Sequence, residues 1–252
     1  MVHFVGAGPG AIDLITLRGK ALLENADVII YAGSLVNPGL LAYAKTGCKN
    51  HNSAKMTLDE VIGVIEAAIT QGKTVVRLHT GDPGIYGAIR EQMDRLDALG
   101  IAYDICPGVS SFCAAAASLK AEYTLPGVSQ TVILTRAEGK TPVPERESLR
   151  SLAEHGATMV LFLSAGLLEA VSCDLIAGGY EPETPAAIVC KASWPGEKIV
   201  RCTVGTLVKG AADNGITKTA LVCVGGFLGN NYELSKLYDP AFTTGFRQGA
   251  EL

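Results

Sequence analysis

The sequence predicts an α/β protein of two domains, the first with a mostly parallel sheet and the second with a mixed sheet. In the first half, short β-rich runs alternate with helical patterns, which is typical of parallel βα units. Glycine-rich turns follow two of those runs. In the second half, two adjacent strands are joined by a short turn, and such a connection requires antiparallel pairing.

The first predicted strand is the apolar run Val2–Val5, which ends in the glycine-rich turn Gly6–Gly10. Apolar residues then recur at helical spacing, which predicts a helix with Leu14, Leu17, Ala21 and Leu22 on its buried face. The next strand is Val28–Tyr31.

Thr57–Glu60 has the form of a capping box and predicts the start of a helix. Its expected buried face consists of Val61, Val64, Ile65 and Ala68, and Gly72 is the expected C-cap. A strand at Thr74–Leu78 follows and ends in the second glycine-rich turn, Thr80–Gly84.

A helix from about Tyr86 to Leu99 and a strand at Ile101–Cys106 complete the expected first domain, together with the small, apolar segment Val109–Ser118, which suits a helix. The turn-rich stretch Glu122–Gln130 marks a change of pattern. We therefore place the domain boundary there, with residues 1–122 in the N-terminal domain and 123–252 in the C-terminal domain.

The second half contains five runs with strand character, two of them separated by the turn at Trp194–Gly196. These runs are Thr131–Thr135, Met159–Leu163, Ala186–Lys191, Lys198–Thr203 and Ala220–Val224. The tail after Gly229 is polar and glycine-spaced, so we expect it to be loosely held.

Composition excludes several classes of partner. The net charge of −4 and the pI near 5.6 argue against nucleic acid or an anionic membrane surface. No apolar run approaches the roughly 20 residues that span a bilayer, and the first strand begins without a basic leader, so we expect a cytoplasmic protein. Seven scattered cysteines indicate reduced, mostly buried thiols, and no spacing of cysteine and histidine suggests a metal site.

The two glycine-rich turns predict a ligand site, because glycine lets the backbone approach a bound molecule at the carboxyl ends of parallel strands. Gly6, Gly8 and Ala11 fit the loose dinucleotide template. However, Asp27 lies at the wrong end of the second strand to bind a ribose, and Pro9 removes an N–H that would bind pyrophosphate. The sequence argues still more strongly against a P-loop, because no Gly-Lys-Ser/Thr follows the glycines.

Several polar side chains near strand ends remain open to two interpretations. Asp82 either accepts hydrogen bonds from a ribose or caps the next helix. His79 has no partner for a catalytic triad, and Trp194 offers a flat apolar surface or anchors a turn. Basic residues near strand ends are surface charges individually, but together they would bind a substrate with several carboxylates. They are Arg77, Arg136, Lys140, Lys191, Lys198 and Arg201.

At this point the motifs resemble those of a known family, the tetrapyrrole methyltransferases. The motifs are Gly6–Gly10, Tyr31–Val36, His79–Pro83, Pro107–Ser111 and Thr131–Gly139. The last of these, extended through Glu145, and Lys191–Pro195 are similar to the precorrin-4 and cobalt-precorrin-4 C11-methyltransferases of cobalamin synthesis in particular. The resemblance runs from Val2 to about Gly226.

The resemblance implies two α/β domains of the tetrapyrrole methylase fold, S-adenosylmethionine in a cleft between them, a tetrapyrrole substrate and a homodimer. The residues that it implies around the cofactor are Gly8, Pro9, Gly10, Thr80, Gly81, Asp82, Ile85, Tyr86, Ser110, Ser111, Leu163 and Ala192. The candidates for binding the substrate are Arg77, His79, Arg136, Lys191 and Arg201.

The chain departs from the family pattern at two places. Ala32 and Gly33 stand where related uroporphyrinogen methyltransferases have an aspartate after the second-strand tyrosine, and Ala11 replaces an acidic residue common after the first turn. No acid-base role transfers to these positions.

Methyl transfer from a sulfonium to an electron-rich ring carbon requires in-line approach and exclusion of water more than a protein nucleophile. We therefore assign no catalytic side chain and no metal. Alternatives that stay open are methylation of another ring position, a diphthine synthase-like reaction on a protein, and a dinucleotide oxidoreductase or nucleotide-binding module. A macrocycle with cobalt and one without it both remain possible substrates.

Overall fold

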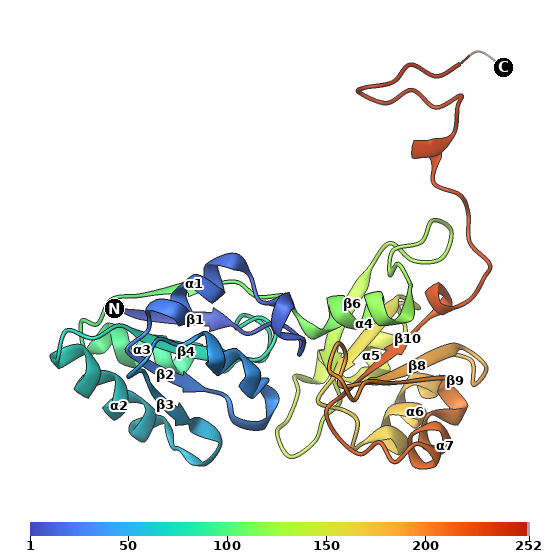
Figure 1. Cartoon of the computed structure of the whole chain (residues 1–252). Coiled ribbons are helices and arrows are strands. Elements are labelled where there is room, and N and C mark those ends of the chain that lie inside the picture. The colour runs from blue at the N-terminus through green and yellow to red at the C-terminus, as the bar shows by residue number, and fades with distance from the viewer. Residues whose placement is uncertain (251–252) are drawn as a thin grey trace. The chain divides into compact units, whose positions relative to one another are not determined.

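The computed structural model describes residues 1–250, apart from the side chain of Ser34, and it divides into two compact units. The first unit contains Met1–Ser118 and the later segment Lys191–Lys198. The second contains Leu119–Cys190 and the chain from Ile199 onwards (Figure 1). The division therefore differs from a single boundary at 122/123, because an eight-residue segment of the second half packs with the first unit.

The sheet of the first unit is parallel in every described pairing, with the strand order β3-β2-β4-β1-β5. Its strands are β1 (Val2–Gly6), β2 (Val28–Tyr31), β3 (Lys49–Asn52), β4 (Val75–His79) and β5 (Tyr103–Cys106). The α/β class and the parallel first sheet are confirmed. The edge strand β3 was not predicted, because Lys-Asn-His-Asn carries no apolar residue to reveal it.

Helices cover this sheet. Where they begin and which face they bury was predicted correctly for some and wrongly for others. The capping box at Thr57 is present, and α2 (Leu58–Thr70) begins directly after it. In α1 (Leu17–Asn25) the expected face is wrong, because Leu17 is 89% exposed whereas Gly19 and Leu23 are buried. Here the side chain of Thr16 caps the helix, which begins after the expected apolar position 14.

The helix expected from Tyr86 is shorter than predicted, since α3 spans only Arg90–Ala98. Tyr86 and Ala88 have positive φ angles of 54° and 48°, which are incompatible with a right-handed helix. The segment before α3 is therefore a turn. The small apolar segment forms α4 (Ser111–Leu119), which begins two residues later than the expected segment and ends one residue later.

Alternation along the strands sends side chains to two hydrophobic clusters, as the pleat requires. Phe4 and Ile30 pack with Ile65 of α2 in one cluster, whereas Val5 and Leu78 belong to another. Because β1, β2 and β4 contribute to both clusters, the sheet is held firmly and the loops at its ends have fixed starting points.

The second unit has a mixed sheet, as expected. Its order is β6-β7-β10-β8-β9; β6 is parallel to β7, and β10 is antiparallel to β7 and β8. The strands are β6 (Val132–Arg136), β7 (Thr158–Phe162), β8 (Pro185–Cys190), β9 (Lys198–Thr203) and β10 (Ala220–Val224). Its helices are α5 (Leu149–Ala153), α6 (Leu168–Ala177) and α7 (Leu207–Asp213).

Short 3₁₀ turns lie between these elements and after β10. They are Ile12–Leu14, Gly33–Leu35, Pro38–Tyr43, Ser53–Lys55, Glu145–Glu147, Val204–Thr206, Gly226–Leu228 and Lys236–Tyr238.

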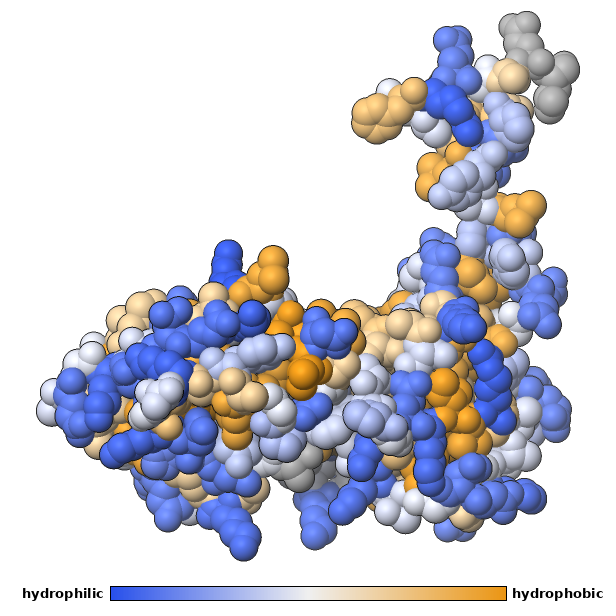
Figure 2. All heavy atoms as spheres, viewed as in Figure 1, coloured by the Kyte–Doolittle hydropathy of each residue, from blue (hydrophilic) through white to orange (hydrophobic). Residues whose placement is uncertain are grey.

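The C-terminal tail exposes large apolar side chains. Leu234, Tyr238 and Phe246 are at least 82% exposed, and hydrophobic and hydrophilic residues alternate over this stretch in Figure 2. Within residues 1–250, no helix is both long enough and apolar enough to cross a membrane. All seven cysteines are free thiols, as expected, but the expectation that most are buried is wrong. Only Cys106 and Cys223 are buried, whereas Cys48, Cys190 and Cys202 are half-buried and Cys113 and Cys173 are exposed.

Candidate functional site

Three loops leave the carboxyl ends of the first sheet and touch one another. We name them the first loop (Gly6–Ala11, after β1), the second loop (Thr80–Gly84, after β4) and the third loop (Pro107–Ser111, after β5). Gly8 and Gly81 exchange two backbone hydrogen bonds, of 3.2 and 2.9 Å, which join the first two loops. Both glycines have positive φ angles, 77° and 59°, that favour glycine over any other residue.

The third loop packs against the other two without room for a side chain. A Cβ on Gly108 would lie 2.2 Å from the carbonyl oxygen of Gly81, and a Cβ on Gly6 would lie 2.5 Å from the Gly108 backbone. The three loops therefore meet backbone to backbone. This contact explains the recurrent glycines that the sequence shows at these strand ends.

Asp82 holds two of these loops together. One carboxylate oxygen accepts a 2.8 Å hydrogen bond from the N–H of Gly84, and the other accepts a 2.9 Å hydrogen bond from the N–H of Gly108. It does not cap α3, which begins eight residues later at Arg90. Asp82 is thus a structural bridge at the edge of the sheet where the cofactor was expected.

A segment from the second half of the chain lies on the first loop. The Trp194 indole Nε1 donates a 2.9 Å hydrogen bond to the carbonyl oxygen of Pro9, and the Ser193 hydroxyl accepts one of 3.0 Å from the N–H of Ala11. The neighbouring Ala192 is buried. Of the two interpretations of Trp194, the structure favours the anchor. Ser193 was missed, because no local pattern marks a contact across 182 residues.

The geometry of the first loop disagrees with a dinucleotide site. The N–H groups of Gly8 and Ala11 are used by Gly81 and Ser193, and Pro9 has none. Asp27 is structural, since it accepts a hydrogen bond from Thr74 and pairs with Lys45 at 2.7 Å. The hydrogen bonds from Lys45 and Thr74 lower the pKa of Asp27.

Arg77 and His79 lie inside the first unit. The Arg77 guanidinium donates to the side chain of Gln92 and to the carbonyl oxygen of Ile30, and burial lowers its pKa to about 10. Only 7% of Arg77 is exposed, which does not fit the expected role of binding a substrate carboxylate. The reason is that Arg77 lies in the middle of β4, where its side chain contacts Gln92 of α3.

His79 is 3% exposed, and its Nε2 has no hydrogen-bond partner within the described part of the chain. Burial and the neighbouring charge of Arg77 lower its pKa to about 3, so the ring is neutral. A neutral, enclosed imidazole does not fit the expected contact with an anionic substrate either.

The remaining expected cofactor residues of the first unit lie on the three loops or directly after them. Thr80 and Ile85 are half-buried, Ser110 is buried and Ser111 is half-buried at the start of α4. Tyr86 is 46% exposed and has a positive φ angle. Pro9 and Gly10 are buried in the first loop.

In the second unit, Leu163 directly follows β7. It combines a positive φ angle of 54° with 66% exposure, which is an unusual and strained state for an apolar side chain. The next residue, Ser164, is fully buried. A strained apolar residue exposed at a strand end is a feature typical of ligand contact.

The basic candidates outside the core differ in how they are engaged. Arg136 donates to the carbonyl oxygens of Ala137, Thr141 and Pro142, and so organises its own loop. Arg201 is exposed and donates to the carbonyl oxygen of Leu119. Lys191 is exposed and has a positive φ angle of 53°.

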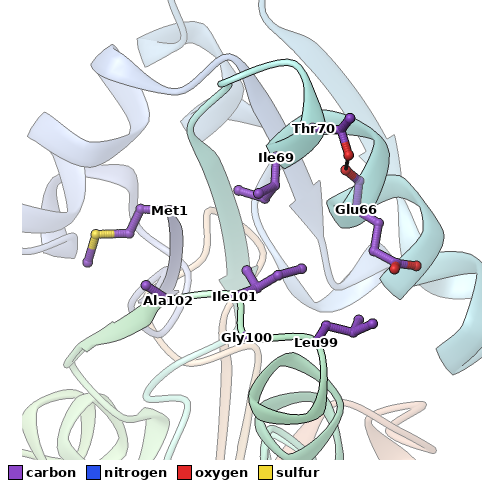
Figure 3. A pocket seen from close by; sticks show the side chains of 8 residues that line it. All are labelled: Met1, Glu66, Ile69, Thr70, Leu99, Gly100, Ile101 and Ala102. Carbon is purple, nitrogen blue, oxygen red and sulfur yellow. Dashed lines mark hydrogen bonds between the residues drawn. The ribbon is translucent and has the colours of Figure 1, made fainter.

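A pocket of about 460 Å³ lies at the opposite edge of the first sheet (Figure 3). It is lined by Met1, Glu66, Ile69, Thr70, Leu99, Gly100, Ile101 and Ala102. These residues precede β1 and β5 or end α2 and α3, so the pocket is remote from the three loops. Among the residues described, no cluster of His, Cys, Asp and Glu is arranged to hold a metal ion.

Comparison with known proteins adds an independent line of support. A cobalt-precorrin-4 C(11)-methyltransferase of Methanocaldococcus jannaschii is 56% identical over 98% of this chain and 96% of its own length. The X-ray structure of a cobalt precorrin-4 methyltransferase, described as a cobalamin biosynthetic enzyme, matches with a TM-score of 0.89 and 49% identity over 91% of this chain and 96% of that one.

A uroporphyrin-III C-methyltransferase of Thermus thermophilus, solved in complex with S-adenyl homocysteine, matches with a TM-score of 0.77 and 27% identity over 90% of this chain and 98% of that one. The family model of the tetrapyrrole (corrin/porphyrin) methylases matches residues 1–208, which include the three loops and the segment that holds the first of them. The chain therefore belongs to the tetrapyrrole (corrin/porphyrin) methylases.

Proposed function

We propose that this protein is an S-adenosylmethionine-dependent methyltransferase that methylates C11 of cobalt-precorrin-4 in cobalamin biosynthesis. The observation that carries the proposal is the 56% identity, over 98% of the chain, to a relative named for that reaction. The solved cobalt precorrin-4 methyltransferase supports it with 49% identity and near-complete coverage. Identity at this level over both units makes a shared substrate class the simplest explanation.

We assign the cofactor to the three loops at the carboxyl edge of the first sheet. Bare backbone at Gly8 and Gly81, the apolar Pro9 and Ile85, and the hydroxyl of Thr80 fit a nucleoside with a short amino-acid arm. The other assigned residues are Gly10, Asp82, Tyr86, Ser110, Ser111, Leu163 and Ala192. A related enzyme solved with S-adenyl homocysteine supports the choice of cofactor.

When bound, S-adenosylmethionine supplies an electrophilic methyl group on a positively charged sulfur and is converted to S-adenosylhomocysteine. The loops of this chain then have two tasks, to orient the donor and to exclude water, and such positioning supplies much of the acceleration. The rigid backbone contacts among Gly6, Gly81 and Gly108 suit both tasks. No side chain of the chain is assigned as a nucleophile.

We assign substrate binding to the cations that lie outside the core, since tetrapyrrole substrates carry several carboxylates. Lys191, Lys198 and Arg201 are exposed, and Arg136 is half-buried beside its own loop. Arg77 and His79 are no longer candidates for direct contact, because both are buried within the first unit.

The test is a product analysis with purified protein and S-adenosylmethionine. Cobalt-precorrin-4, metal-free precorrin-4 and uroporphyrinogen III are supplied in parallel, and mass spectrometry and NMR locate the added methyl group. We expect one methyl at C11 and the highest kcat/KM with the cobalt form. Faster turnover of the metal-free form would show that precorrin-4 without cobalt is the preferred substrate. Methylation at another ring position would overturn the proposed reaction.

The cofactor is tested by calorimetry with S-adenosylhomocysteine and NADH side by side. We expect saturable binding of S-adenosylhomocysteine and none of NADH, because the N–H groups of Gly8 and Ala11 are already engaged. Selective binding of NADH would indicate a dinucleotide enzyme instead.

We further propose that the enzyme acts as a homodimer in the cytoplasm, as its family resemblance implies. Light scattering coupled to size-exclusion chromatography is expected to give twice the 26.2 kDa mass of one chain. Fractionation of the cells that produce it is expected to recover the protein with the cytosolic enzymes. A monomer mass, or recovery with membranes, would contradict the respective part.

A further inference from the structure

The segment Lys191–Lys198 connects two strands of the second unit but packs with the first unit. It follows β8 directly and ends where β9 begins. Lys191 and Ser193 within it have positive φ angles of 53° and 66°, a conformation that non-glycine residues adopt only when their surroundings enforce it. Such local strain at a detour in the chain points to a purpose beyond joining two strands.

Trp194 is fitted to the first loop by both shape and hydrogen bonding. A Cβ on Gly10 would lie 2.0 Å from the indole Cδ1, so the ring packs directly on the bare backbone of that glycine. The indole N–H donates to the carbonyl oxygen of Pro9, the neighbouring residue. Trp194 therefore fixes the part of the first loop to which we assign the cofactor.

Glu197 stabilises this arrangement by accepting two hydrogen bonds. Its Oε2 accepts a 2.6 Å hydrogen bond from the N–H of Ser193 and a 2.7 Å hydrogen bond from the hydroxyl of Ser118, in the last turn of α4. Ser193 in turn accepts from the N–H of Ala11. A continuous series of hydrogen bonds thus runs from α4, the helix that follows the third loop, through Glu197 and Ser193 to the end of the first loop.

We infer that Trp194 and Glu197 are positioning residues for the cofactor: together with Ser193 they clamp the first loop in the conformation that binds S-adenosylmethionine. The inference rests on the proposed function, since it takes the first loop as part of the cofactor site. It goes beyond that function, because it assigns control of cofactor affinity to a segment inserted between two strands of the other unit.

The main experiment measures the affinity for S-adenosylhomocysteine by calorimetry in Glu197→Ala, Glu197→Gln and Trp194→Phe. Glu197→Ala removes the acceptor that orients Ser193, and we expect about tenfold weaker binding, the size of one well-placed hydrogen bond. Glu197→Gln retains an acceptor oxygen and is expected to restore most of the affinity. Trp194→Phe keeps an aromatic ring on Gly10 but loses the bond to Pro9, and about threefold weaker binding is expected.

Glu183→Ala is the matched control, because Glu183 is an exposed glutamate ahead of β8. Its affinity is expected to equal that of the wild type. Ser193→Gly guards against a variant that fails to fold, since glycine relieves the positive φ angle while it removes the hydroxyl. This variant is also expected to bind S-adenosylhomocysteine about tenfold more weakly. In the methylation assay, the KM for S-adenosylmethionine should rise in Glu197→Ala and Ser193→Gly while kcat stays near the wild-type value. Glu183→Ala should leave both constants unchanged.

A second readout follows from composition, because Trp194 is the single tryptophan of the chain. Its fluorescence is expected to change saturably as S-adenosylhomocysteine is added to the wild type, with the Kd that calorimetry gives. If calorimetry shows binding but the fluorescence is silent and Glu197→Ala and Ser193→Gly keep wild-type affinity, the inference is wrong and the proposed function stands. If the wild type does not bind the ligand at all, the cofactor assignment of the proposed function fails instead.

Discussion

The strand-end loops of the two units are built in different ways. After β1 and β5, backbone packs on backbone, and Gly6 and Gly108 leave no space for a Cβ. After β6 and β7, side chains do the same work: the buried Ser164 hydroxyl accepts from the N–H of Ala137 and donates to the carbonyl oxygen of Phe162. In those loops, a Cβ on Gly166 would make an ordinary contact of 3.7 Å, and a Cβ on Gly139 would make a tighter one of 3.3 Å, to the end of the Leu167 side chain rather than to backbone.

This difference indicates which substitutions the loops of each unit tolerate. A loop held by close backbone contacts has no room for a Cβ at the contact positions, here Gly6 and Gly108. A loop held by side chains accepts a new methyl group but depends on individual hydroxyl or guanidinium groups. The first arrangement suits a cofactor that is always the same, and the second can be tuned to a particular substrate.

The largest expected effect is that of Gly108→Ala. Its Cβ would lie 2.2 Å from the carbonyl oxygen of Gly81, so the second and third loops must separate. We expect a loss of about 3 kcal/mol in the free energy of unfolding, measured by urea denaturation. Gly166→Ala in the second unit is the control and is expected to cost less than about 1 kcal/mol. Equal losses would remove the distinction between the two units.

Ser164→Ala tests the second unit. The substitution leaves the N–H of Ala137 buried without its acceptor, and a buried polar group without a partner costs about 2 kcal/mol. The same denaturation measurement applies. Ser172→Ala serves for comparison and should cost less, because the half-buried Ser172 hydroxyl donates a hydrogen bond to the carbonyl oxygen of Val204 and does not serve as the acceptor of a buried N–H. A Ser164→Ala variant as stable as the wild type would show that side chains do not hold these loops.

The buried His79 of the first unit is expected to make the free energy of unfolding depend on pH. Its pKa is about 3 in the folded protein and near 6.5 when unfolded, so the unfolded state takes up a proton first as the pH falls. The stability that the neutral ring provides is therefore fully present above about pH 6.5 and decreases below it, by about 1 kcal/mol for each pH unit.

The measurement is urea denaturation between pH 7.5 and about 5 on the wild type and His79→Phe. The wild type should lose stability more steeply than the variant. His155→Gln, an exposed site of the second unit, should follow the wild type. Parallel profiles for the wild type and His79→Phe would contradict the assignment of this dependence to His79.

The smallest effect is expected for Arg136→Ala. The carbonyl oxygens of Thr141 and Pro142 lose a donor, but both hydrogen bonds are exposed, so water replaces the donor at a cost of about 0.5 kcal/mol. Turnover of the tetrapyrrole should fall while the calorimetric affinity for S-adenosylhomocysteine stays unchanged. A matching loss of cofactor affinity would mean that Arg136 does not act on the substrate side alone.

Prediction from the sequence succeeded where the cause is local. The capping box at Thr57 sets the start of α2, because its partners are three residues apart. Strands β9 and β10 have the predicted limits. Prediction failed at β3, which has no apolar residue, and at α3, where positive φ angles at Tyr86 and Ala88 delay the helix.

By itself, the sequence determined the α/β class, most strands and helices and the glycine-rich loops, since periodicity, capping and turn chemistry act over a few neighbouring residues. The family followed from the resemblance of its motifs to a known family, not from these local patterns. Only the tertiary structure decided that Arg77 is enclosed, that Asp82 bridges two loops, and that Ser193 binds Ala11. Each of these contacts joins residues that the chain order separates, Arg77 to Ile30 by 47 positions and Ser193 to Ala11 by 182. Such pairs form only when the strands and loops between them have been packed together, which no local pattern encodes.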